Sequence, residues 1–424
     1  MYKNMSLAVF FKIISAVLSF ITVPILMRTI GVDNYGLWAA LVSVLGTIVL
    51  FDFGLGQTLK NSIAEYLARE EMHNAKKEIL LNVFLAMKIS VVMLICFFII
   101  FPMVGIWKNN AFIAITLYVF FILTFPLSIG SMILQGSRNI GIQSAITVIP
   151  SLFFLFFIFF LPQEYKNAIQ NITFFYIISF VFSYAALWFV VFKRFGFKKS
   201  EFNTSIFKEK LRKEKINVSI GFFILQLSSL ILYSIGTFIV INAMDSKSAA
   251  YYDSLNKIFL FAMSLFNIGI AVFWPEIARM KELKDFSSIL KLYKIMLAIS
   301  ILFSLSTLFL AYITPTLGEW WLGDILKIKR EDAYFFAALT IVQSLAYAGA
   351  VILNAFEDVR IQTYLSVISI IVMYPLCELF IGLGMGIVSI PFSAMLITLF
   401  PMCYCNLRAV FVIKKGAKNV KKNI

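Results

Sequence analysis

The sequence predicts an all-α polytopic membrane protein with about twelve transmembrane helices in two six-helix halves. Three observations predict this fold class. Of the 424 residues, 61% are hydrophobic, whereas soluble domains are about 45–50% apolar, and a soluble fold of this size could not hide so much apolar surface. Apolar runs long enough to cross a bilayer as a helix recur along the whole chain. Short motifs of the first half also reappear in the second.

The hydropathy pattern divides the chain into candidate spans, and Pro and Gly residues cluster where the spans end. The first span is too long for a signal-peptide core and no small-residue cleavage site follows it, so we interpret it as a retained helix. The predicted limits are 7–30, 37–58, 79–101, 111–135, 143–161, 172–192, 217–242, 250–274, 292–314, 333–356, 361–383 and 387–412.

The basic residues predict the orientation, because cytoplasmic loops retain Lys and Arg. Most of the 37 Lys and Arg residues fall on one side of these spans if the N-terminus is cytoplasmic. Both termini are therefore predicted to be cytoplasmic. The net charge of +15 then reflects topology and attraction to anionic lipid head groups. No soluble domain could carry a nucleic-acid groove, so we expect membrane lipids and no nucleic acid as partners.

A repeated motif predicts the two halves. Pro-x-x-Gly-x-Trp occurs at Pro102 to Trp107 and again at Pro315 to Trp320, and each proline is expected to end a span. The segments that begin at Ile133 and Ile352 share Ile, Leu, Gln and Val at matching positions. An even number of spans in each half implies a pseudo-twofold axis along the membrane normal. The predicted parts are a first half (1–192), a basic cytoplasmic linker (193–216), a second half (217–412) and a basic cytoplasmic tail (413–424).

The sequence predicts no cofactor and no catalytic centre. The cysteines lie in apolar segments without a disulfide or zinc spacing, and His73 has no metal-binding companions. Neither a P-loop nor a paired carboxylate motif is present. We therefore expect no metal and no enzyme, and coupling to a proton or sodium gradient stays open.

Two spans carry a polar stripe at helical spacing. The first is Lys12, Ser15, Ser19 and Thr22, and the second is Gln226, Ser229, Tyr233 and Gly236. Residues at these spacings share one helix face. Because polar groups in a span are costly, such a face is expected to point into the bundle interior. The stripes either contact substrate or pack helices together through small residues.

Four cations lie within spans: Lys12, Arg28, Lys88 and Lys257. Each is near enough to a membrane surface to snorkel, or each could contact a substrate. The guanidinium of Arg28 could hold a phosphate with two hydrogen bonds. The notable acids within spans are Asp52 and Glu378. This balance favours an anionic substrate.

The segment from Val23 to Ala68 resembles the N-terminal signature of O-antigen-unit polysaccharide flippases (Wzx-like) of the MATE/MOP exporter superfamily. The resemblance rests on Pro24, Arg28, Gly31, Tyr35-Gly36, Asp52-x-Gly54-Leu55 and Lys60. Many relatives carry Arg at the Lys60 position. "FWPEIARM" and "WWLGD" are similar to segments of the second half of the family.

The resemblance implies a flippase of the bacterial inner membrane that translocates an undecaprenyl-pyrophosphate-linked oligosaccharide. It also implies the polysaccharide polymerase machinery as a partner. We expect Arg28, Lys12 and Lys257 to hold the pyrophosphate, and Gln226, Tyr233, Asn256 and Asn267 to contact sugar or line the cleft. The full set of expected cleft residues is Arg28, Lys12, Ser15, Ser19, Asp52, Lys60, Gln226, Tyr233, Asn256, Lys257 and Asn267.

Two alternatives stay open. A drug or organic-cation antiporter of the same superfamily would be expected to carry a carboxylate inside the first or seventh span, and neither has one. A membrane sugar polymerase or glycosyltransferase would be expected to carry acidic residues or a large outer loop. The outer loops here are short.

Overall fold

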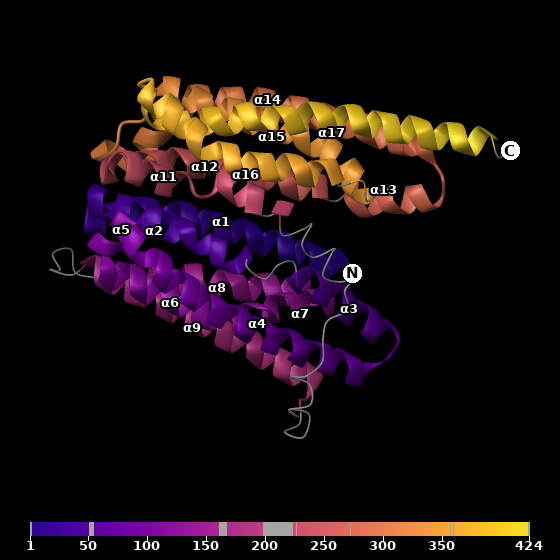
Figure 1. Cartoon of the computed structure of the whole chain (residues 1–424), viewed down its shortest axis with the longest axis horizontal. Coiled ribbons are helices and arrows are strands. Elements are labelled where there is room, and N and C mark those ends of the chain that lie inside the picture. Colours follow the sequence, from indigo (N-terminus) through magenta and orange to yellow (C-terminus); the bar gives the residue numbers. More distant parts are fainter. Residues whose placement is uncertain are drawn as a thin grey trace. The chain divides into compact units, whose positions relative to one another are not determined.

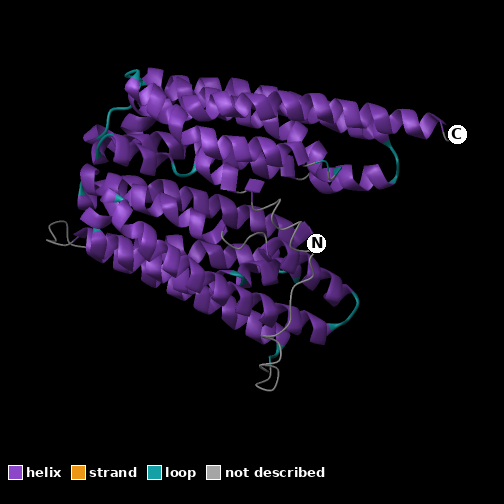
Figure 2. Cartoon of the chain, viewed as in Figure 1, coloured by secondary structure: helices purple, strands orange, loops and turns teal. Residues whose placement is uncertain are grey.

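The computed structural model describes residues 2–50, 55–160, 168–197, 224–225, 227–271, 273–356, 358 and 360–422. Within these ranges the chain is helical, with loops and turns between the helices and no strand (Figure 2). The fold divides into two compact units, Met1–Leu227 and Ser228–Ile424. Each unit is described by itself below. The all-α fold class that the sequence predicts is thus confirmed.

The described part of the first unit contains seven long or medium helices and three short ones; Figure 1 shows their arrangement. Gly31 separates α1 from α2 and has a φ of +80°, a conformation that glycine adopts without strain. The elements are α1 (Tyr2–Ile30), α2 (Val32–Leu50), α3 (Leu55–Ala68), α4 (Met72–Ile100), η1 (Phe101–Met103), α5 (Gly105–Asn109), α6 (Ala111–Ser128), α7 (Gly130–Gly136), α8 (Ile140–Phe159) and α9 (Ala168–Phe195).

The second unit contains the longest helices of the described chain. In Figure 1, α14, α15 and α17 run side by side, as their packing contacts also show. The elements are α11 (Gly236–Ala243), α12 (Ser246–Ala271), α13 (Phe273–Glu282), α14 (Phe286–Leu322), η4 (Gly323–Ile325), α15 (Arg330–Ala355), α16 (Arg360–Gly382), η5 (Gly386–Val388) and α17 (Ser389–Lys422). Residues 227–233 before α11 are also helical.

Nine stretches of the described residues are long and apolar enough to cross a membrane. They are Ser6–Ile30, Met72–Met103, Ala111–Gly136, Ile140–Phe159, Ala168–Phe195, Phe286–Ile325, Arg330–Ala355, Arg360–Gly382 and Gly386–Lys418. Each overlaps one predicted span, which makes the chain a multi-pass membrane protein. Predicted span 37–58 corresponds to α2 and the start of α3. Predicted span 250–274 corresponds to α12. Most of the predicted linker, 193–216, lies outside the described residues.

The helices of the two units pack in the same order. In the first unit, α3 packs on α4 and α7, α2 on α6, and α8 on α9. In the second, α13 packs on α14 and α15, α12 on α15, and α16 on α17. Ile63 of α3 and Ile277 of α13 are both fully buried. This agreement supports the internal duplication that the repeated motifs predict.

The two Pro-x-x-Gly-x-Trp motifs differ in structure. Pro102 is the second residue of η1, which follows directly after α4 ends at Ile100, as expected. Pro315 instead lies inside α14, which continues to Leu322, so the prediction that this proline ends a span is wrong. The next turns are held by packing, because Gly318 lies against the side chain of Ile328 and Trp321 is buried. This packing offsets the lost hydrogen bond and the ring clash of an interior proline.

Candidate functional site

The polar stripe of the first span lies on α1. Lys12 and Ser19 are exposed, Ser15 is half-buried, and Thr22 is buried with its hydroxyl donating to the Leu18 carbonyl at 2.7 Å. Among the described residues, no carboxylate lies within ion-pair distance of Lys12. The stripe therefore combines one exposed and one half-buried hydroxyl with an ammonium that has no carboxylate partner among the described residues.

Arg28 is also exposed, but it belongs to a different part of α1. The helix is continuous from Tyr2 to Ile30, so Lys12 and Arg28 lie about 24 Å apart along its axis and about 160° apart around it. A diphosphate group is far shorter than this separation. The expectation that Lys12 and Arg28 hold one pyrophosphate together is therefore incompatible with the helix geometry.

Lys60 lies half-buried on α3. Its backbone carbonyl lies so close to Gly136 of α7 that a Cβ there would approach it to 2.6 Å. Lys60 thus sits at a tight crossing of α3 and α7. Asp52, the expected partner of Lys60 or of a cation on the first span, lies outside the described residues.

A small, partly open hollow lies within the second unit. Two of the expected residues, Tyr233 and Asn256, line it together with Thr340, Gln343 and several aromatic side chains. The Tyr233 and Thr398 hydroxyls are hydrogen-bonded at 3.0 Å. The lining contains hydroxyls, amides and aromatic rings but no charged side chain. Gln226 lies outside the described residues.

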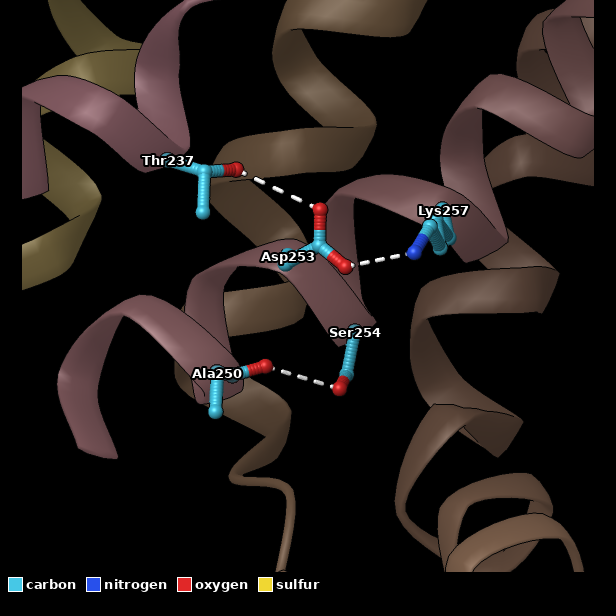
Figure 3. A network of polar contacts seen from close by, with 5 residues as sticks. All are labelled: Thr237, Ala250, Asp253, Ser254 and Lys257. Atoms are coloured by element: carbon cyan, nitrogen blue, oxygen red, sulfur yellow. Dashed lines mark hydrogen bonds and ion pairs between the residues drawn. The ribbon is translucent and has the colours of Figure 1, made fainter. Parts of the chain in front are cut away.

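An ion pair lies on α12 close to this hollow in sequence (Figure 3). The Lys257 ammonium contacts Asp253 Oδ2 at 2.7 Å, and the Thr237 hydroxyl of α11 donates to Asp253 Oδ1 at 3.3 Å. The side chain of Lys257 is 30% exposed and that of Asp253 is 11% exposed. Lys257 is therefore reachable, but a carboxylate already neutralises its charge.

The helix crossing beside this pair is close. Gly236 of α11 lies against Tyr252 of α12, and a Cβ on Gly236 would overlap the tyrosine hydroxyl. Gly236 is the last residue of the second predicted polar stripe. Its close packing agrees with the interpretation in which small residues of the stripe pack helices together. Further along α12, the buried Oδ1 of Asn267 has no hydrogen-bond partner among the described residues.

Sequence reasoning missed Asp253. The signal was available, because Asp253 and Lys257 are opposite charges four residues apart in predicted span 250–274, a spacing that pairs them on a helix. It also missed Gln343 and Thr398, polar residues of predicted spans that meet Tyr233 or the hollow. Neither falls on a polar stripe that the sequence reveals.

The first 281 residues of the chain match the model of a family described as polysaccharide biosynthesis protein. The chain belongs to this family. It is also similar to a candidate O-antigen export protein of Yersinia pseudotuberculosis, with 21% identity over 362 residues, 78% of this chain and 76% of that protein.

Solved structures of MATE transporters have the same fold. An inward-facing multidrug resistance MATE transporter of the MOP superfamily superimposes with a TM-score of 0.75 and 12% identity, over 95% of this chain and 96% of that one. An outward-facing structure gives a TM-score of 0.68 and 12% identity, over 98% and 96% of the two chains. The chain therefore belongs to a polysaccharide biosynthesis family and has the fold of MATE transporters.

Proposed function

We propose that this protein is a flippase that moves an undecaprenyl-pyrophosphate-linked oligosaccharide from the cytoplasmic to the outer leaflet of the bacterial inner membrane. Family membership supports a role in polysaccharide biosynthesis, and the MATE fold supports transport. The cargo is an O-antigen unit or a similar surface-polysaccharide repeat. Its delivery in the outer leaflet would make the polysaccharide polymerase machinery a partner.

The observation that carries this proposal is exposed Lys12 on the polar stripe of α1. Lys12 lies among hydroxyls without a carboxylate partner in the described part of the chain. An unneutralised ammonium in a membrane segment is costly unless it serves an anionic ligand or reaches the interface. A pyrophosphate is such a ligand, and the hydroxyls of Ser15 and Ser19 would supply further hydrogen bonds.

The separation along α1 gives these cations successive roles. Lys12 lies toward the predicted cytoplasmic end of the helix and Arg28 toward the outer end. We infer that Lys12 meets the headgroup on entry and Arg28 meets it later, while the lipid tail stays in the bilayer. Energy would come from a proton or sodium gradient or from the membrane potential, with Asp52 as a titrating group.

The test is leaflet-to-leaflet transfer of a fluorescent undecaprenyl-pyrophosphate oligosaccharide in liposomes, followed by quenching from outside. Lys12→Ala and Arg28→Ala should each slow transfer by about 30-fold or more, because each removes a charged contact to phosphate. Lys108→Ala on α5 is the matched control, since Lys108 is an exposed lysine outside the nine apolar stretches. Normal transfer by the Lys12 variant would contradict the proposal.

An organic-cation antiporter is the second candidate, and one observation favours it. The buried carboxylate of Asp253 accepts a hydrogen bond from Thr237, which belongs to the predicted seventh span. That span has no carboxylate of its own. The charge of Asp253 is already matched by Lys257. Gradient-driven movement of a fluorescent organic cation in the same liposomes, without lipid transfer, would favour the antiporter.

A further inference from the structure

The Asp253 carboxylate contacts Lys257 in the way that a bound anionic ligand would. Asp253 Oδ2 lies 2.7 Å from the Lys257 ammonium, the distance expected for a charge-assisted hydrogen bond. A phosphate oxygen that binds this ammonium would take a similar position. The carboxylate takes one of the three N–H groups of the ammonium, and its negative charge repels an incoming phosphate, so the two anions compete for the charge of Lys257.

The surroundings keep Asp253 in this place. Its second oxygen accepts from Thr237, and its residue is only 8% exposed. The neighbouring acid, Asp332 of α15, is engaged elsewhere, because it accepts from the Tyr251 hydroxyl at 2.7 Å. Figure 3 shows the carboxylate between its two partners. Asp253 is thus an acid held in an ion pair with Lys257.

We propose that Asp253 is an internal competitor of the substrate's phosphate for Lys257, and that it thereby sets how fast the headgroup is released. This inference rests on the proposed flippase function. Lys257 is the positioning cation of the second unit, and Asp253 weakens its hold. Binding tight enough to capture the lipid but weak enough to let it leave is needed for turnover.

The location of the pair gives this competition a place in the transport cycle. Lys257 lies about 17 Å along α12 from Ser246, in the half of the helix that the basic residues predict to be outer. Lys12, near the predicted cytoplasmic end of α1, has no such carboxylate partner in the described residues. Capture by an unneutralised cation would then precede release from a neutralised one.

The first experiment measures binding of sugar-free undecaprenyl pyrophosphate to the full-length protein in nanodiscs. Asp253→Asn keeps the size of the side chain and an oxygen that accepts from Thr237, but it removes the charge. The variant should bind the lipid about tenfold more tightly, within the usual range of coupling between two groups. It should also transfer the fluorescent oligosaccharide several-fold more slowly at saturating substrate, because release is slowed.

A double-mutant cycle separates competition from a structural role. Lys257→Gln should weaken binding, since it leaves an unmatched carboxylate near the phosphate. The double variant should lose the gain of Asp253→Asn. A structural role predicts weaker binding in both single variants. Tighter binding by Asp253→Asn alone therefore supports competition, and unchanged or weaker binding overturns it.

Glu276→Gln is the matched control, because Glu276 forms an exposed ion pair with Arg279 on α13 at a similar spacing. It should change neither binding nor transfer. If Asp253→Asn fails to fold, Asp253→Ser tests the same loss of charge. Wild-type protein that neither binds nor transfers the lipid would overturn the flippase function itself. If the wild-type protein binds and transfers the lipid, and the Asp253→Asn variant does so equally well, only the role of Asp253 is overturned.

Discussion

The two units share a helix crossing built around a glycine, and they differ in what meets that glycine. Gly130 of α7 and Gly349 of α15 are separated by the same offset that relates Ile133 to Ile352. A Cβ on Gly130 would meet the side chain of Leu187 on α9, whereas one on Gly349 would come within 2.8 Å of backbone atoms of Cys405 and Asn406 on α17.

The difference shows which parts of a duplicated scaffold are free to diverge. The order of helix packing is kept, while the distance between two helices and the polar contents of each unit have changed. In the first unit, α2, α6, α8 and α9 meet through aromatic rings around Trp38 and Tyr176. In the second, the matching region holds the hollow and the Asp253–Lys257 pair.

The largest effect on stability is expected at the glycine crossings. Gly349→Ala should lower the free energy of unfolding by about 1–3 kcal/mol, because its neighbours are backbone atoms that cannot rotate away. Gly130→Ala should have a smaller effect, since Leu187 can change rotamer and alanine favours a helix by about 1 kcal/mol. Unfolding followed by helical circular dichroism in one detergent would compare them. Equal losses would contradict the described difference.

A smaller effect is expected at one arginine near the end of α9 and one in the middle of α17. Arg408 Nε donates to the Asp358 carboxylate at 2.8 Å, and Arg194 donates to the Ser137 carbonyl at 3.4 Å. Arg408→Ala should cost about 1 kcal/mol or less, because both partners are partly exposed, and the loss should shrink in high salt. Arg194→Ala should cost less. A salt-independent loss at Arg408 would argue against an ion pair.

The smallest effect is expected at the starts of α4 and α14. Asp285 caps α14 by accepting from the Ser288 backbone N–H at 3.1 Å, whereas Glu71 at the start of α4 makes no capping bond. The hydrogen bond to Ser288 lowers the pKa of Asp285. Its contribution is therefore present above the unfolded pKa and is lost as pH falls through the lower folded pKa.

Asp285→Ala should consequently reduce stability at neutral pH and flatten its decline in acid. Glu71→Ala is the comparison and should leave the acid profile closer to that of the wild type. Thermal unfolding measured at a series of pH values would check both. An identical acid profile for the Asp285 variant and the wild type would show that the cap adds nothing.

Spans were the most predictable part of this protein. Hydropathy depends on composition over about twenty residues, so the stretches from Ala111 to Gly136 and from Arg330 to Ala355 were expected within a few residues. Proline was a poorer guide, because its effect depends on packing. Pro102 ends a helix and Pro315 does not, although both stand in the same motif.

The site was less predictable because it depends on which residues meet. Tyr233 and Asn256 were expected from polarity within a span, and they do line one hollow. Thr237 and Asp253 meet across two helices, which helix spacing within one span cannot reveal. The separation of Lys12 and Arg28 required only the pitch of α1, once that helix was known to be continuous.

The helix α17 is long enough to extend beyond the membrane and to amplify small tilts at its end. Its 34 residues correspond to about 51 Å, whereas the hydrocarbon core of a bilayer is about 30 Å thick. The helix therefore continues well beyond the membrane on the side of its basic end. A tilt of the second unit too small to resolve near the bilayer centre would be magnified at that end. A spectroscopic label near Lys418 would thus report any such tilt from outside the membrane.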